Sequence, residues 1–196
     1  MMRLKHWLAA ALLLPAIAGA EARFEIDPAH SSAQFSVKHM MITNVRGEFS
    51  KVTGSAVWDA RNLAASHLEA IIDTSTVNTG EAKRDDHLRS ADFLDAAKHP
   101  VMTFKSKEFL RAGGGLRIKG DLTLHGVTRE IVLDVDGPSP EVKDPWGSTR
   151  IGATATTTIS RKDFGLTWNK ALETGGVLVG DEVRITLDVQ LVRKDS

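Results

Sequence analysis

Six histidines lie downstream of residue 22, and histidine is the side chain best suited to metal binding and to proton transfer near neutral pH. They are His30, His39, His67, His87, His99 and His125. Local ligand motifs place two such residues a few positions apart, as in His-Glu-x-x-His, and none of the six forms such a pair with another. The spacing therefore predicts no metal site, and most of these side chains are expected in turns or on the surface.

The motifs of common enzyme classes are absent from the sequence. It contains no Gly-x-Ser-x-Gly elbow, no Gly-x-x-x-x-Gly-Lys-Ser/Thr phosphate loop and no dinucleotide fingerprint between a strand and a helix. Cysteine is missing, which excludes cysteine nucleophiles, thiolate zinc sites and disulfides. Carboxylates are plentiful, but an acid–base pair depends on a separation that the sequence does not give. We predict no catalytic residue and no cofactor.

The most unusual polar cluster runs from Lys83 to Ser90 and reads Lys-Arg-Asp-Asp-His-Leu-Arg-Ser. Because an arginine fork binds phosphate or carboxylate, Arg84 could hold the polar head of a ligand, with His87 beside it. The same charges could instead form a solvated helix face, with Arg84 and Asp85 linking the segment to the rest of the fold. Both interpretations stay open.

The elements that would position these residues are mostly strands. After residue 22 the chain alternates apolar and polar residues, the period that turns side chains to opposite faces of a sheet. The clearest stretch is 116–124, and 81–97 is the one segment expected to be a short helix or helical loop. The other expected strands are 33–37, 45–58, 68–73, 101–109, 131–135, 151–159 and 183–191.

Eight short strands, each with one apolar face, predict an all-β fold that is either a closed barrel or a sandwich. No linker or composition shift divides residues 23–196, so we expect a single domain. The interior of an eight-stranded barrel is wide enough to be filled by side chains or to hold one slender ligand. An outer-membrane barrel is disfavoured because it needs aromatic girdles, and tyrosine is absent from the chain.

Charge and the N-terminal residues bear on partners and location. The charges of the 25 basic and 25 acidic residues cancel, and the basic ones are scattered, unlike those of a nucleic-acid-binding protein.

The N-terminal residues have the layout of a signal peptide cleaved after Ala20 or Ala22. Two basic residues come first, an apolar run follows at 8–17, and small residues come after it. The apolar run is about half the roughly 20 residues that span a bilayer. We expect 1–22 to be removed, leaving an exported protein with no integral membrane segment.

Several motifs follow one another in order between about Phe24 and Val192. They are Ile-Asp-Pro-Ala-His-Ser at 26–31 with Phe-Ser-Val-Lys-His at 35–39, Arg-Asp-Asp-His-Leu-Arg-Ser at 84–90 with Asp-Phe-Leu-Asp at 92–95, Pro100 with Phe-Lys-Ser at 104–106, Gly-Asp-Leu-Thr-Leu-His-Gly-Val-Thr at 120–128, Arg-Lys-Asp-Phe-Gly at 161–165 and Val-Gly-Asp-Glu-Val at 179–183. In this combination the chain resembles the YceI family of bacterial periplasmic proteins, a lipocalin-like group.

The resemblance implies a single eight-stranded antiparallel lipocalin-like β-barrel with one short helical segment at 23–196. It also implies an apolar lumen that holds a long lipid chain, which in this family is a polyisoprenoid or a related quinone-like or fatty molecule, and it implies no catalytic residues. The candidate lumen residues are Phe35, Val37, Phe49, Phe104, Leu116, Ile118, Leu122, Ile185 and Leu187, and the candidate mouth residues are His39, Arg84 and His87.

We therefore predict a periplasmic lipid-binding or carrier protein. One alternative is a secreted enzyme acting on a lipid-like substrate, which requires His39, His87 or His125 to meet an acidic residue in one pocket. Another is a stress-related interaction protein with a filled barrel and a partner-binding loop at 138–147. The sequence leaves the oligomeric state open, a homodimer included.

Overall fold

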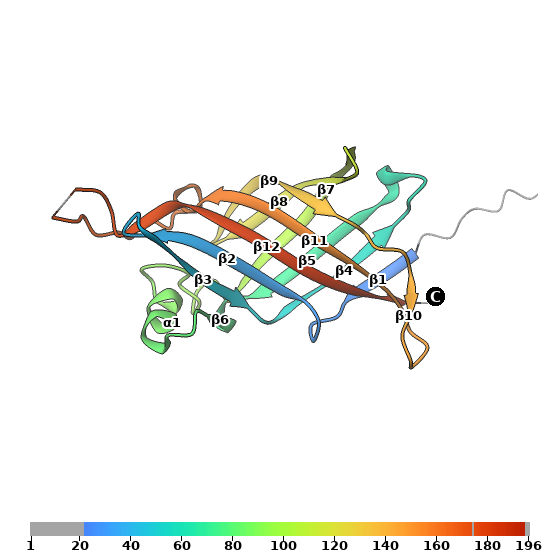
Figure 1. The fold of residues 1–196 in the computed structure, drawn as a ribbon, viewed down its shortest axis with the longest axis horizontal. Coiled ribbons are helices and arrows are strands. Elements are labelled where there is room, and N and C mark those ends of the chain that lie inside the picture. Colours follow the sequence, from blue (N-terminus) through green and yellow to red (C-terminus); the bar gives the residue numbers. More distant parts are fainter. Residues whose placement is uncertain (1–21, 174, 195–196) are drawn as a thin grey trace, which may run out of the picture.

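The computed structural model describes residues 22–173 and 175–194, which form an elongated antiparallel β-barrel with one α-helix (Figure 1). The expected signal peptide lies outside the described residues apart from Ala22. Within the described part of the chain, no helix is long and apolar enough to cross a membrane.

Eight strands close the barrel, and every neighbouring pair is antiparallel. Around the ring they are β1 (Ala22–Ile26), β4 (Val52–Trp58), β5 (His67–Asp73), β7 (Val101–Ala112), β8 (Gly115–Leu124), β9 (Val127–Asp136), β11 (Thr149–Ser160) and β12 (Val179–Lys194). The ring closes where β12 pairs with β11 over eleven residue pairs. The predicted lipocalin-like barrel is confirmed.

The remaining elements extend the wall or cover its ends. The first half of β12 pairs with β2, whereas its last residues pair with β1. Figure 1 shows α1 at one end of the barrel and β10 near the opposite end. These elements are β2 (Ser32–His39), β3 (Thr43–Phe49), β6 (Val77–Asn78), β10 (Val142–Lys143), α1 (Ala82–Arg89) and the 3₁₀ turns η1 (Leu63–Ala65), η2 (Thr74–Thr76) and η3 (Arg161–Phe164).

The two faces of the strands follow the alternation of the sequence. On β8, Leu116 and Ile118 are each 6% exposed, while Arg117 between them points outward and its Nε lies 2.8 Å from Asp134 Oδ1 on β9. The prediction of one strand over 45–58 was wrong. Two exposed residues, 50 and 51, separate the buried Phe49 from the buried Val52, so the alternation breaks and the chain bends between β3 and β4.

The charged run in α1 chiefly anchors the helix. Asp85 is 7% exposed and accepts hydrogen bonds from the backbone N–H and the hydroxyl of Thr79, at 2.8 and 2.6 Å. Arg89 donates to the carbonyl oxygens of Ser75 and Val77, both at 2.9 Å. These bonds connect α1 to η2 and β6, so the structural interpretation of this run accounts for most of its charges.

Asp27 connects the turn between β1 and β2 to β11. Its Oδ2 lies 2.9 Å from His30 Nδ1 and accepts a hydrogen bond from Arg150 of β11. The Nε of Arg150 also donates to Asp144 Oδ2 at 2.7 Å. The hydrogen bond with His30, followed by that with Arg150, lowers the pKa of Asp27 to about 2.

This network predicts an acid-sensitive contribution to stability. Because the pKa of Asp27 in the folded state is below its ordinary value, its contribution is complete above about pH 4 and is lost as the pH falls towards 2. We expect Asp27→Asn to reduce the free energy of unfolding by about 1–2 kcal/mol at pH 7 and to flatten its pH dependence between 4 and 2. Urea unfolding at several pH values measures both.

The matched control is Glu25→Gln on β1. Glu25 pairs with Lys194 at 2.8 Å, and both side chains are more than half exposed, so the loss should stay below about 1 kcal/mol. A variant Asp27→Asn that unfolded with the full pH dependence of the native chain would contradict the assignment.

Candidate ligand-binding site

The barrel encloses an apolar cavity of about 440 Å³. This volume lies within the range of roughly 300–1,000 Å³ that is typical of small-molecule sites. Every strand of the closed ring contributes to the wall, as do β2 and β3. The barrel is elongated (Figure 1), and the residues of β12 that line the cavity run from Val179 to Leu191, which are twelve positions apart and so about 40 Å along the strand. The geometry suits a slender apolar molecule.

The nine lumen residues predicted from the sequence all line the cavity. Leu116, Ile118 and Phe49 are the most buried, at 6, 6 and 8% exposed. The others are Phe35, Val37, Phe104, Leu122, Ile185 and Leu187. They face inward together because each occupies an alternate position on its strand and the registers of neighbouring strands place these positions side by side.

Several aromatic residues of the wall were not predicted. Trp58 on β4 and Phe109 on β7 both line the cavity, with ring centroids 6.3 Å apart. Trp168, which follows η3, lines it as well. Trp58 ends its strand and Trp168 lies outside any strand, so alternation alone gave no reason to place either indole in the lumen.

The three predicted mouth residues also line the cavity, and they come from the end of β2 and from α1, which lie at the same end of the barrel (Figure 1). His87 contacts Phe93 and Trp168 edge-on, with ring centroids 5.0 and 4.7 Å away. Arg84 donates to the hydroxyl and the carbonyl oxygen of Thr79, at 2.7 and 3.0 Å. Part of the Arg84 fork is therefore occupied in positioning α1.

Arg161 is the main polar residue of the cavity that the sequence did not single out. It is 4% exposed, and its guanidinium donates to the carbonyl oxygens of Gly180 and Trp168, both at 2.9 Å, and to that of Leu166. Burial lowers its pKa below the ordinary value, while the charge of Asp181 opposes this effect. Arg161 thus connects η3 to the chain segment leading into β12 and supports one end of the cavity.

The geometry bears on both alternative interpretations. His39 and His87 line the cavity, but His125 does not. His87 Nε2 lies 2.8 Å from Asp92 Oδ2, and Asp92, which is 53% exposed, is not a lining residue. Among the described residues that line the cavity there is no aspartate or glutamate, so His39 and His87 meet no carboxylate inside it. The interior is also hollow, whereas the interaction-protein alternative required a filled barrel.

A closed antiparallel barrel around an apolar, ligand-sized lumen places the protein among the lipocalin-like barrels. The sequence refines this class. The chain belongs to the YceI-like domain family, which matches residues 24–191.

Relatives and solved structures agree with this membership. A UPF0312 protein of Vibrio cholerae is 43% identical over 162 residues, which cover 81% of this chain and 85% of the relative. The YceI protein of Campylobacter jejuni has a TM-score of 0.67 at 30% identity, covering 81% of this chain and 90% of its own. A polyisoprenoid binding domain from Saccharophagus degradans, implicated in plant cell wall breakdown, shares the fold with a TM-score of 0.62 at 18% identity, covering 89% and 100%.

The bonding of Arg161 leads to a stability prediction. Arg161→Met keeps the unbranched apolar part of the side chain but leaves several buried carbonyl oxygens without their donor, so we expect a loss of about 2–3 kcal/mol in the free energy of unfolding. The neighbouring Lys162 is half exposed and pairs with Asp181 at 2.8 Å, so Lys162→Met should cost less than about 1 kcal/mol. Equal losses in urea unfolding would contradict the role given to Arg161.

Proposed function

We propose that the protein binds a long, slender lipid of the polyisoprenoid type in its lumen and carries it in the periplasm. The observation that supports this most strongly is the cavity itself, which is enclosed by the sheet and lined by apolar side chains from every strand of the ring. The shared fold with a polyisoprenoid binding domain supports the same class of ligand.

Apolar burial alone provides enough affinity for such a ligand. Each CH₂ group removed from water contributes about 0.8 kcal/mol, so a prenyl chain with several isoprene groups binds tightly without a polar contact. The same argument makes the wall tolerant, because it holds few groups that would select one chain over another. A quinone-like or fatty molecule belongs to the same proposal, and competition between these lipids would rank them.

The polar head of the lipid is proposed to lie at the α1 end. His39, Arg84 and His87 line the cavity there, and the middle of the wall is apolar. His87 is the best placed of the three because Phe93 and Trp168 fix its ring and its side chain is still 40% exposed.

The export and periplasmic location are proposed from the signal-peptide pattern at 1–22. No enzymatic step is part of the proposal.

A pair of substitutions on β11 tests lumen binding. Ala155 is 8% exposed and lines the cavity, whereas the next residue, Thr156, points outward. Ala155→Phe places a ring in the lumen. The ring takes volume that the ligand would fill. Because each CH₂ group kept in water costs about 0.8 kcal/mol of binding and 1.4 kcal/mol is tenfold in affinity, displacing two or more such groups should weaken binding of a dansylated prenyl probe about tenfold or more. Thr156→Phe should leave binding unchanged.

Energy transfer from tryptophan to the dansyl group gives the measurement, since Trp58 and Trp168 both line the cavity. The melting temperature of each variant checks that it folds. Native protein that does not bind the probe, or equal binding by both variants, would count against a lumen site.

A further inference from the structure

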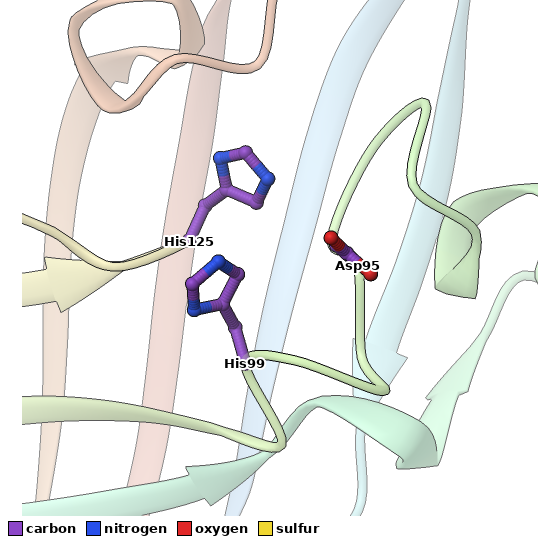
Figure 2. Close-up of side chains that lie close together, drawn as sticks. All are labelled: Asp95, His99 and His125. Atoms are coloured by element: carbon purple, nitrogen blue, oxygen red, sulfur yellow. The ribbon is translucent and has the colours of Figure 1, made fainter.

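A second group of side chains meets at the α1 end of the barrel, and none of its members lines the cavity. Figure 2 shows Asp95 and His99 on the segment that follows α1, with His125 on the facing β8–β9 turn. One nitrogen of each imidazole and one carboxylate oxygen lie within 4.8 Å of one another. The two imidazole rings are 4.9 Å apart between centroids.

Local backbone geometry brings Asp95 and His99 to the same side. The N–H of His99 donates to the carbonyl oxygen of Asp95 at 2.8 Å, which makes one helical turn and places residues four apart next to each other. The side chain of Asp95 is only 13% exposed. The hydroxyl of Thr74 also donates to the carbonyl oxygen of His99 at 2.8 Å and holds the end of this turn.

The β8–β9 turn supplies the third group. His125 and Gly126 have φ values of +52° and +73°, the left-handed pair that a tight two-residue hairpin requires. A Cβ on Gly126 would lie 2.7 Å from Cε1 of His99, so the ring of His99 packs directly on the turn. The hairpin and the segment after α1 are therefore in contact, although His99 and His125 are 26 residues apart in the sequence.

The hydrogen bonding of His125 prepares it as a ligand. Its Nδ1 lies 3.3 Å from the carbonyl oxygen of Phe164, and because a carbonyl only accepts, this nitrogen carries the proton. The lone pair is then on Nε2. Histidines that bind metals almost always donate their other N–H to a carbonyl or carboxylate in this way. The carboxylate of Asp95 pairs at 3.0 Å with Lys98, whose side chain is 74% exposed and which a metal ion would displace.

We propose that Asp95, His99 and His125 bind Zn²⁺. Two neutral imidazoles and a carboxylate are borderline ligands that suit zinc, and three protein ligands leave a fourth position for water. Zinc bonds of about 2.0–2.1 Å place tetrahedral ligand atoms about 3.3 Å apart, so the side chains must close by somewhat over 1 Å. Rotation of the side chains supplies this movement, because the backbone already places all three residues where the segment after α1 contacts the β8–β9 hairpin.

Zinc in this position would link the segment after α1 to the β8–β9 hairpin. Leu94 and Leu124, which directly precede Asp95 and His125, both line the cavity. The metal would therefore stabilise one end of the cavity wall without touching the lumen. The proposal does not depend on which lipid the lumen holds.

Zinc binding to purified protein, prepared without a histidine tag and stripped by a chelator, tests the site. We expect competition with a chromophoric chelator to give one Zn²⁺ per chain. Asp95→Asn, His99→Gln and His125→Asn should each weaken binding about tenfold or more. Asparagine tolerates the positive φ of positions 95 and 125, so these variants should keep the backbone.

His67→Gln is the matched control, since His67 is exposed on β5. Zinc at about 100 times its dissociation constant should raise the melting temperature of the native chain by roughly 5–10 °C, and of His67→Gln equally. A native chain that takes up no zinc, or variants that bind as tightly as the control, would overturn the site. The Ala155→Phe chain should keep its zinc, which separates this test from that of the lumen.

Discussion

The structure depends on the pairing of one long strand with neighbours on both of its sides. β12 pairs with β11 along one edge and with β1 and β2 along the other, and this closes the sheet. Once the sheet is closed, alternate side chains of every strand must face a common interior. The chain has no cysteine, so backbone pairing and apolar burial, without disulfides, supply the stability of the barrel. The apolar lumen follows directly from this closure.

Polar function is consequently confined to the ends of the barrel. Inside the sheet, a charged group would lose its hydration without a partner. At the α1 end, the chain leaves the sheet and polar groups find partners: Asp85 binds Thr79, Arg161 binds carbonyl oxygens, and His87 pairs with Asp92. The proposed zinc ligands lie at this end for the same reason. A helical turn brings Asp95 and His99 next to each other, whereas residues four apart on a strand would be separated by about 13 Å.

Sequence reasoning succeeded where a local rule determined the outcome. Period-two alternation predicted that Leu116 and Ile118 face the lumen, and the helical segment expected at 81–97 contains α1. It failed where the outcome depended on contacts between distant segments. The buried bonds of Arg161 and the meeting of His99 with His125 arise only when the barrel is closed. Alternation also does not reveal whether the interior is hollow, because this depends on how side chains from all the strands together fill one volume.

The most direct test of a lipid-filled lumen is to identify what the protein carries when it leaves the cell. Protein purified without detergent would be extracted with organic solvent and the extract analysed by mass spectrometry, with Ala155→Phe protein treated in parallel. The account predicts a prenyl or similar long-chain lipid in near-stoichiometric amount from the native chain and much less from the variant. A lumen that is reproducibly empty, and that takes up no added prenyl lipid, would contradict it.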